Sequence, residues 1–153
     1  MISIREARID EIKKLQDLND DAFSRNPELD PDLVLDWAQS DHGKAYFTNT
    51  INSSKDVLFV AEEDEKLIGY IGASDKPINF RNSRYMEIDN LGIAKAYRRK
   101  GIATMLMKKC FEWGEERGYQ RVYLSCYFKN TEAIEFYKQA GFSEISVSFE
   151  RDL

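Results

Sequence analysis

The N-terminal part of the chain combines strand-like alternation with helical spacing of apolar residues. Residues 2–5 alternate apolar and polar side chains, which predicts a short first strand. Apolar side chains then recur about one helical turn apart, at Ile9, Ile12, Leu15 and Leu18. This spacing predicts an amphipathic helix over residues 10–23, which Pro27 would interrupt. A second helix is expected over residues 31–37, and helix again over residues 44–47.

Strand patterns dominate the middle of the chain. Residues 57–61 form an apolar run, residues 62–66 are polar, and residues 67–73 are mainly apolar again. Two apolar runs joined by a short polar turn predict an antiparallel hairpin. Residues 84–94 are rich in apolar and β-branched side chains and predict the next strand.

Helical and strand patterns alternate in the C-terminal part. A helix over residues 100–117 is predicted by one apolar stripe, which consists of Ile102, Leu106, Cys110 and Trp113. A strand is expected over residues 121–126, a short helix over residues 131–139, and a final strand over the alternating residues 145–149. This order places a crossover helix between two central strands, after an antiparallel hairpin. It predicts an α/β layer fold with a mixed sheet in a single domain, residues 1–153.

Composition is that of a folded domain and narrows the possible chemistry. Hydrophobic residues make up 42% and charged residues 32%, which argues against disorder. The only cysteines, Cys110 and Cys126, form no CxxC pair, and His42 is the only histidine. We therefore expect no disulfide framework and no metal site. The sequence shows no signal-like or membrane-spanning apolar stretch, so we expect a cytoplasmic protein that does not bind membranes.

Charge is distributed unevenly along the chain. The net charge is −5, and acids strongly outnumber bases over residues 10–36. Residues 95–109, in contrast, hold six bases and no acid. An acidic protein is a poor general binder of nucleic acid, so the basic segment points to a compact anion such as a phosphate. The alternative is that both clusters are solvated helix surface.

The basic segment has the features of an anion-binding loop. The strand over residues 87–93 leads through residues 94–97 into Arg98-Arg99-Lys100-Gly101-Ile102-Ala103, where the next helix begins. Helix N-termini expose unpaired N–H groups and carry positive partial charge, and a glycine lets backbone approach phosphate oxygens closely. The GxxxxGK[ST] loop and the GxGxxG fingerprint are both absent.

Two segments resemble a known family. Residues 91–106, Leu-Gly-Ile-Ala-Lys-Ala-Tyr-Arg-Arg-Lys-Gly-Ile-Ala-Thr-Met-Leu, resemble the acetyl-CoA signature of the GNAT (GCN5-related N-acetyltransferase) superfamily. Residues 130–142, Asn-Thr-Glu-Ala-Ile-Glu-Phe-Tyr-Lys-Gln-Ala-Gly-Phe, resemble its second signature. The resemblance is strong over residues 87–142 and weak before residue 57. It implies a mixed, mostly antiparallel sheet of about six to seven strands, with splayed central parallel strands and about four flanking helices.

The resemblance also implies a cosubstrate and the residues that hold it. Acetyl-CoA would be the cosubstrate, with its pantetheine arm on the backbone of Leu91, Gly92 and Ile93. Its pyrophosphate would lie on N–H groups of the anion loop, which comprises Arg98, Arg99, Lys100, Gly101, Ile102, Ala103 and Thr104. Asn130 matches a side chain that often contacts the cosubstrate, and Tyr137 matches a tyrosine that often lies near the sulfur.

Catalytic groups can be assigned from chemistry and position. Tyr137 is a phenol that is protonated at neutral pH, so it can donate a proton to the departing thiolate. An amine nucleophile must lose a proton, and Glu87 and Asp89 would project from one face of the strand that enters the site. Glu87 is the first choice because it matches the catalytic glutamate of some histone-acetylating members, and Asp89 is the second. Alternatively, both carboxylates face solvent on a half-exposed strand, and a bulge would upset the spacing.

Two other reactive side chains carry no assignment. Cys126 is expected to be a buried core residue and not an acyl-carrying nucleophile. His42 is expected in a loop far from both signatures.

The sequence therefore predicts an N-acetyltransferase that transfers acetyl directly to a primary amine within a ternary complex. The acidic residues 10–36 favour a cationic acceptor, either a small amine or a peptide amine. Aromatic residues that could line its pocket are Phe23, Trp37, Phe80 and Tyr85. The alternative is a non-catalytic module that binds acetyl-CoA or CoA. Either a monomer or a homodimer is compatible with the sequence.

Overall fold

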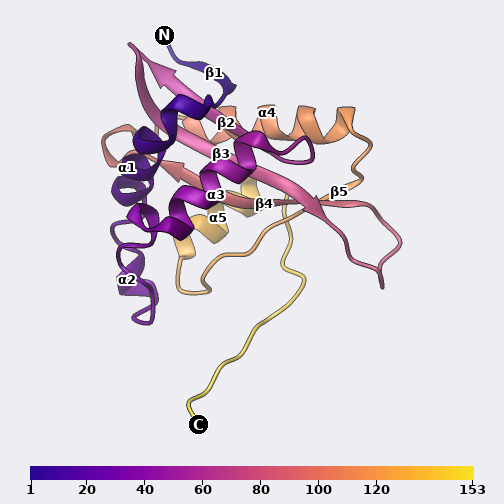
Figure 1. The fold of residues 1–153 in the computed structure, drawn as a ribbon. Coiled ribbons are helices and arrows are strands. Elements are labelled where there is room, and N and C mark those ends of the chain that lie inside the picture. The colour runs from indigo at the N-terminus through magenta and orange to yellow at the C-terminus, as the bar shows by residue number, and fades with distance from the viewer.

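A five-stranded sheet organises the computed structural model, which describes residues 1–153 (Figure 1). The strands lie in sequence order: β1 (Ser3–Glu6), β2 (Val57–Glu63), β3 (Lys66–Lys76), β4 (Tyr85–Ile93) and β5 (Arg121–Tyr123). The first four strands pair in antiparallel fashion, whereas β5 runs parallel to β4. The mixed, mostly antiparallel sheet is confirmed, but it has five strands and not six or seven.

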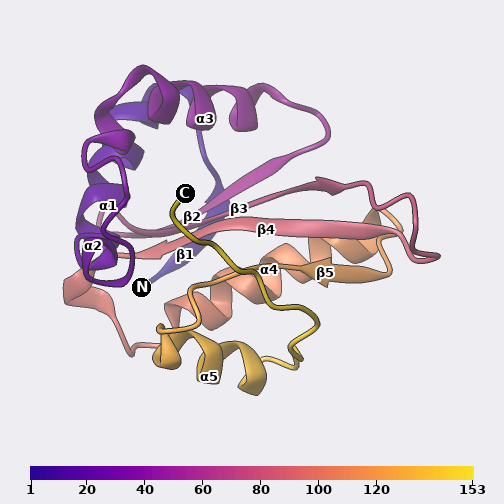
Figure 2. The same cartoon turned by 90° about the horizontal axis from the view of Figure 1, so that it is seen from below.

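Helices cover both faces of the sheet (Figure 2). The α-helices are α1 (Ile12–Ala22), α2 (Asn26–Leu29), α3 (Asp41–Asn52), α4 (Ile102–Glu116) and α5 (Thr131–Gln139). Helices α1 and α3 lie on one face, and α4 and α5 lie on the other. The helix α4 is the crossover that joins the parallel strands β4 and β5, as the sequence predicts.

The sheet buries apolar side chains on both faces because helices pack on both. Under α4, the core includes Phe59, Ile71, Met86 and Leu106. Under α1 and α3, it includes Leu15, Phe47, Leu58 and Tyr70. Strands β2 and β3 therefore form near-continuous apolar runs, which is the pattern that identified them in the sequence.

Two expected helices differ from the structure. No helix forms over residues 31–37; instead α2 covers Asn26–Leu29 with Pro27 in its first turn, and the short 3-10 helix η2 covers Trp37–Gln39. The expected helix over residues 44–47 is part of the longer α3, where the Ser40 side chain accepts a hydrogen bond from the Gly43 N–H. His42 therefore lies in the first turn of a helix and not in a loop.

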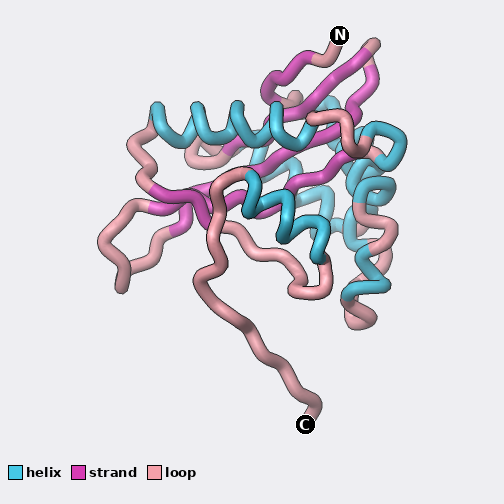
Figure 3. Tube along the Cα trace, turned by 180° about the vertical axis from the view of Figure 1, so that it is seen from behind, coloured by secondary structure: helices cyan, strands magenta, loops and turns pink.

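The expected final strand over residues 145–149 is absent. The chain after α5 has no regular structure, and it leads away from the sheet (Figures 1 and 3). Its alternating apolar side chains, Ile145, Val147 and Phe149, are exposed. The alternation has the period of a strand, but no neighbouring strand is there to pair with it.

Candidate active site

Strands β4 and β5 separate partway along β4. They pair only from Tyr85 with Arg121 to Glu87 with Tyr123. Strand β4 continues to Ile93, bonded on its other side to β3. From Ile88 onward, the β4 backbone groups that face β5 have no strand partner. This opened edge is the kind of backbone surface that an extended, amide-containing ligand can pair with.

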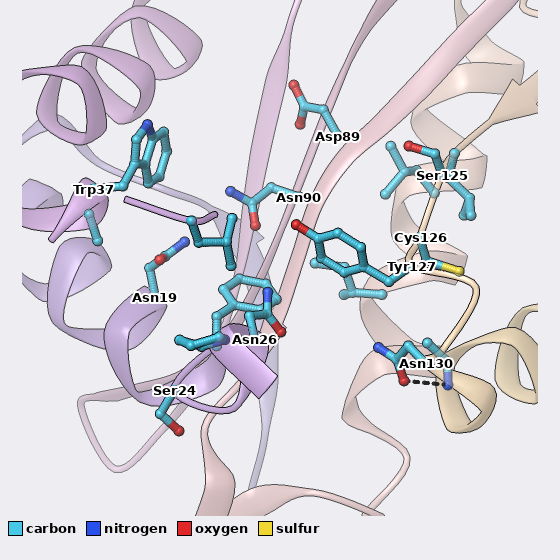
Figure 4. Close-up of a pocket in the computed structure, with 18 of the residues that line it drawn as sticks. Asn19, Ser24, Asn26, Trp37, Asp89, Asn90, Ser125, Cys126, Tyr127 and Asn130 are labelled. Atoms are coloured by element: carbon cyan, nitrogen blue, oxygen red, sulfur yellow. Dashed lines mark hydrogen bonds between the residues drawn. The ribbon is translucent and has the colours of Figure 1, made fainter. Parts of the chain in front are cut away.

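A cavity of about 900 Å³ lies at this opening. Figure 4 shows Asn19 and Trp37 on one wall, Ser125, Cys126, Tyr127 and Asn130 on the other, and Asp89 and Asn90 on β4 between them. Leu91 and Tyr137 also line it, whereas Gly92 and Ile93 continue the strand beyond it. Segments from both halves of the chain thus meet around one pocket.

A β-bulge aims β4 side chains into the pocket. Asn90 lies opposite Gly72 and Ile88 lies opposite Ala73, so Asp89 is an extra residue in β4. A bulge re-aims neighbouring side chains. Here Asp89 and Asn90, although consecutive, both line the pocket. Glu87 stays in regular pairing with Ser74, whereas Asp89 is the bulge residue, so the bulge falls between the two expected acids.

Asp89 is a partly desolvated carboxylate with one hydroxyl partner. Its Oδ1 accepts a hydrogen bond of 2.8 Å from the Tyr46 hydroxyl of α3. Burial raises the pKa of Asp89, the Tyr46 hydrogen bond opposes this rise, and the negative charge of Glu87 adds to it. A carboxylate with a raised pKa in a pocket is suited to accept a proton.

Glu87 lies in a different environment. Its Oε2 is 2.6 Å from Lys76 Nζ on the neighbouring strand β3. It does not line the pocket. The structure therefore does not bring the two expected acids together in one cavity, because Glu87 is held by an ion pair outside it.

A buried polar network that sequence reasoning missed connects Asn19 and Asn90, two residues of the pocket lining. Asn19 of α1 donates to the Tyr70 hydroxyl at 2.6 Å, and that hydroxyl donates to Asn90 Oδ1 at 2.7 Å. The network joins α1, β3 and β4. No local signal in the sequence announces it, because its three members are brought together only by tertiary packing.

The anion loop has the expected backbone geometry. Gly101 is the N-cap of α4 with a φ of 78°, and Arg99 also has a positive φ of 60°. No side chain caps this helix end. The first N–H groups of α4, beginning at Ile102, are therefore open to an outside acceptor. Ala103 follows in the same turn and adds only a methyl group.

The basic side chains of the loop face several directions. Arg98 donates to the carbonyl oxygen of Ala22, the last residue of α1, at 2.5 Å. Arg99 lies 3.6 Å from Glu132 at the exposed start of α5, and the Lys100 ammonium lies 5.0 Å from the Tyr97 ring centroid. The Lys95 N–H also donates to Asp21 of α1 at 2.8 Å. Arg98 thus ties the loop to α1, and Arg99 and Lys100 remain near its surface.

The second signature forms the opposite wall of the pocket. Asn130 is the N-cap of α5, where its side chain accepts a hydrogen bond of 3.2 Å from the Ala133 N–H. Tyr137 lies about two turns later and also lines the pocket. Burial, with a smaller contribution from Cys126, raises the pKa of Tyr137 to about 12. Its phenol is therefore fully protonated at neutral pH.

The expectation that Cys126 is buried is wrong. Cys126 is exposed and lines the pocket, because the segment after β5 turns away from the core. Partial burial raises the pKa of its thiol, so the unreactive protonated form dominates at neutral pH.

Acidic and aromatic side chains are also part of the pocket lining. Asp20, Phe23 and Trp37 line it, as expected for part of the acidic segment. Phe80 and Tyr85, in contrast, lie outside the pocket. Phe80 is exposed in the loop between β3 and β4, and Tyr85 is buried.

A hydrogen bond joins the segment after β5 to the segment after α2. The Tyr127 hydroxyl, on the segment between β5 and α5, donates to Asp30 Oδ2 at 2.8 Å. Asp30 directly follows α2, so this contact joins the two walls that Figure 4 shows facing each other.

No group of three or more His, Cys, Asp and Glu side chains is arranged to hold a metal ion. None of the helices combines the length and the apolar character that crossing a membrane requires.

An opened parallel strand pair beside an uncapped helix N-terminus is an arrangement that can hold an extended, phosphate-bearing ligand. Comparison with known proteins identifies the class more closely. The acetyltransferase (GNAT) family model matches residues 12–142, so this chain belongs to the GNAT acetyltransferase family.

Individual relatives agree with this assignment. The chain is 33% identical over 103 residues to the uncharacterized N-acetyltransferase MJ1207 of Methanocaldococcus jannaschii. The aligned residues cover 67% of this chain and 46% of that protein. It is 29% identical over 115 residues to streptothricin acetyltransferase A of Bacillus subtilis, covering 71% of this chain and 65% of that protein. The chain spans about half the length of the first of these relatives.

Solved structures share the fold. The tetramutant of the BH1408 protein from Bacillus halodurans superposes with a TM-score of 0.84 at 19% identity, over 99% of both chains. The aminoglycoside N-acetyltransferase AAC(6')-Iy in complex with CoA superposes with a TM-score of 0.77 at 20% identity, over 99% of this chain and 95% of that chain.

Proposed function

We propose that this protein is an acetyl-CoA-dependent N-acetyltransferase that transfers acetyl directly to a primary amine. The observation that carries the proposal is the pocket at the opening between β4 and β5, which is lined by Asp89 and Tyr137 and lies beside the anion loop. Membership of the GNAT family supports it. The CoA complex of a structural neighbour supports the choice of cosubstrate.

The residues present fit acetyl-CoA. The N–H groups from Arg98 to Thr104 would hold the pyrophosphate, with Gly101 shaping the loop. Along Leu91, Gly92 and Ile93, the backbone groups that face the opening, away from β3, would hold the pantetheine arm. Asn130 would contact the arm from the opposite wall. Acetyl-CoA supplies an activated acetyl group as a thioester.

Asp89 is our choice for the base, in preference to Glu87. Free alkylamines are mostly protonated at neutral pH, so the acceptor must lose a proton before its nitrogen can attack. Asp89 lines the pocket and has a raised pKa, whereas Glu87 is paired with Lys76 outside it. Asp89 would take the proton directly or through a water molecule.

Tyr137 is our choice for the acid. Its pKa of about 12 keeps the hydroxyl protonated, and its place in the pocket puts that proton at the wall where the sulfur would lie. Donation to the departing thiolate would leave CoA as a thiol. Backbone N–H groups of β4 near Leu91 would polarise the carbonyl oxygen, as an oxyanion hole does.

A cationic acceptor is the class that best fits the lining of the pocket. Asp20 and Asp89 provide negative charge there, and Trp37 provides an aromatic face on which a cation can rest. The names of two relatives and neighbours, a streptothricin acetyltransferase and an aminoglycoside N-acetyltransferase, agree with amine acceptors of this kind.

Release of CoA thiol, followed with dithionitrobenzoate across a panel of amines, tests the proposal. The panel should contain polyamines, aminoglycosides and basic peptides, with neutral alcohols as controls. We expect thiol release that depends on an amine and yields an N-acetylated product by mass spectrometry. Binding of acetyl-CoA without turnover on any amine would instead identify a non-catalytic CoA-binding module, and a stable acetyl-enzyme would exclude direct transfer.

A further inference from the structure

The side-chain amide of Asn90 is held by hydrogen bonds that lead from α1 through β3. The Asn19 amide nitrogen donates to the Tyr70 hydroxyl at 2.6 Å, and that hydroxyl donates to Asn90 Oδ1 at 2.7 Å. Tyr70 is fully buried, and burial raises its pKa, so the hydroxyl keeps the proton that it donates. These hydrogen bonds therefore run in one direction and end on the oxygen of the Asn90 amide.

This direction decides which end of the Asn90 amide is left for a ligand. Because Oδ1 is bound to Tyr70, the other end of the amide is Nδ2, which carries two N–H donors. Burial raises the pKa of Tyr46, and the Asn90 amide opposes this rise, so one N–H lies toward the Tyr46 hydroxyl. The second N–H is left for a hydrogen-bond acceptor in the pocket that Asn90 lines.

Asp89 gives this donor a place relative to the reacting amine. Asp89 is the bulge residue of β4, and both it and Asn90 line the pocket between the two walls (Figure 4). Consecutive Cα atoms are about 3.8 Å apart. If Asp89 takes the proton of the amine, the atoms next to the amine nitrogen therefore lie beside Asn90.

We propose that Asn90 determines acceptor specificity by selecting amines with an oxygen on the carbon next to the one that bears the nitrogen. The inference rests on the proposed acetyl transfer and narrows its acceptor class. The Asn90 N–H donates to this oxygen while the nitrogen lies at Asp89. Two kinds of compound have the arrangement: α-amino carbonyl compounds, such as a peptide N-terminus, and vicinal amino alcohols, such as aminoglycosides. Polyamines and the lysine side chain lack it.

The selection follows from the cost of an unpaired donor. An acceptor without the oxygen would displace water from the Asn90 N–H and return no hydrogen bond. A site that is built to bind a polar group rejects an analogue that lacks the group. We expect the oxygen to raise kcat/KM by about 10-fold to 100-fold. Asn19 and Tyr70 are positioning residues, because they fix the amide and do not touch the acceptor.

The test compares acceptors with and without the oxygen in the thiol-release assay. The oxygen-bearing acceptors are leucinamide, leucinol and an aminoglycoside. The oxygen-free acceptors are spermidine and the deoxy analogue of leucinol, which has the same carbon skeleton. Wild type should prefer oxygen-bearing acceptors by about 10-fold or more in kcat/KM. The better of leucinamide and leucinol tells whether the selected oxygen belongs to a carbonyl or to a hydroxyl group.

Asn90→Asp tests the residue itself. The carboxylate can still accept from Tyr70, but it presents an oxygen where Asn90 presents an N–H. The preference for oxygen-bearing acceptors should fall by roughly 10-fold or more, with little change in the KM for acetyl-CoA. Comparing the preference between wild type and variant cancels differences in amine basicity and in the folded fraction of the variant.

Tyr70→Phe tests the positioning role. It removes the hydroxyl that fixes the Asn90 amide, so part of the preference should be lost even though the ring remains. The matched control is Tyr85→Phe, another buried tyrosine, whose hydroxyl lies 3.5 Å from Arg121 and outside the pocket. The control should keep the wild-type preference.

Three results would overturn the inference. The first is a wild-type protein that acetylates spermidine or the deoxy analogue as efficiently as every oxygen-bearing acceptor. The second is a preference that Asn90→Asp leaves intact. The third is an equal loss of preference in Tyr70→Phe and Tyr85→Phe, which would remove the positioning role. Acetylation without the preference would leave the proposed acetyl transfer standing, whereas no thiol release with any amine would refute the transfer and this inference together.

Discussion

Asp89 owes its position to one extra residue in β4. The bulge directs it into the pocket with Asn90, while Glu87 pairs with Lys76. We predict that Asp89→Asn lowers kcat by about 100-fold or more, the usual range for loss of general acid–base catalysis. Asparagine is close to isosteric and can still accept the Tyr46 hydrogen bond.

The control for this prediction is Glu87→Gln, measured in the same steady-state assay. It should change kcat at most a few-fold. If Glu87→Gln were the more damaging variant, the roles that we assign to the two carboxylates would have to be exchanged.

Tyr46 opposes the rise that burial causes in the pKa of Asp89. Its hydrogen bond favours the ionised carboxylate and so lowers a pKa that burial raises. Removing the hydroxyl in Tyr46→Phe should raise the pKa of Asp89 further. The acidic limb of kcat/KM against pH should then move to higher pH, because the base must be deprotonated to act. If the acidic limb of kcat/KM stayed at the same pH in Tyr46→Phe, a group other than Asp89 would control that limb.

Tyr137 should matter for turnover and not for binding. Tyr137→Phe removes the proton donor but keeps the ring, which packs against Phe136 and Phe142. We expect kcat to fall roughly 100-fold with little change in the KM for acetyl-CoA. Since the pKa of Tyr137 is about 12, wild type should show no basic limb from this group in an ordinary assay range. A rise in KM with unchanged kcat would reduce Tyr137 to a packing residue.

The sequence does not distinguish Asp89 from Glu87 as the base. The two residues are two positions apart on one strand, so a regular strand would project both side chains from the same face. The family resemblance favours Glu87. What separates them is the bulge and the Lys76 ion pair, and both follow from the register of β3 against β4. Register depends on long-range pairing, which is not encoded in the local pattern.

At the scale of elements, the start of α4 depends on one glycine. Gly101 has a φ of 78°, and an added Cβ would meet nothing within 4 Å, so substitution costs backbone strain alone. We predict that Gly101→Ala destabilises the protein by about 1 kcal/mol and raises the KM for acetyl-CoA, because relief of strain moves the loop N–H groups.

Gly118, two residues beyond α4, is the matched control. Its φ is 77°, and an added Cβ would make only ordinary contact with Arg84, at 3.6 Å. Gly118→Ala should show a similar loss of stability in chemical denaturation and a normal KM. An equal rise of KM in both variants would show that global destabilisation, and not loop geometry, affects acetyl-CoA binding.

Elements with complete local signals were predicted closely. The helix over residues 131–139 matches α5, because Asn130 caps its start and Gly141, with a φ of 97°, follows its end. Residues 31–37 contain an apolar run, but they form no helix, because no apolar surface of the fold packs against them and Val34 and Leu35 remain exposed. Residues 145–149 had strand alternation, but a strand also needs a partner.

At the scale of the whole molecule, one charged cluster joins the N-terminal strand to the first helices. Glu11 is almost fully buried and accepts hydrogen bonds from Arg5 at 2.6 Å and from the Arg8 N–H at 2.8 Å. Arg5 also pairs with Glu62 of β2 at 2.6 Å. We predict that Glu11→Gln lowers the free energy of unfolding by about 2 kcal/mol, because the partly buried positive charge of Arg5 would lose one of its two negative partners.

The pH dependence of this effect has a definite sign. The Arg5 hydrogen bond, aided by Arg8, holds the pKa of Glu11 below its ordinary value of 4.5. The carboxylate therefore stabilises the fold above its unfolded pKa, and this contribution is lost as the pH falls through the lower folded value. The difference in the free energy of unfolding between wild type and Glu11→Gln, measured by denaturant unfolding, should become smaller at acid pH. The control is Asp10→Asn, at an exposed neighbouring residue, which should leave the free energy of unfolding nearly unchanged. If the difference between wild type and Glu11→Gln did not depend on pH, the ionised Glu11 carboxylate would not be the stabilising group.

The contacts between the anion loop and α1 have a consequence for the affinities of the two substrates. Arg98 donates a hydrogen bond to the last carbonyl of α1 and the Lys95 N–H donates one to Asp21, while Asn19 and Asp20 of the same helix line the pocket. A ligand that reshapes the loop therefore also shifts the wall on which the acceptor rests. The two affinities are thermodynamically linked, and each substrate must alter the affinity for the other by the same factor. Binding of acetyl-CoA at the anion loop and binding of the amine would therefore be coupled, whichever substrate binds first.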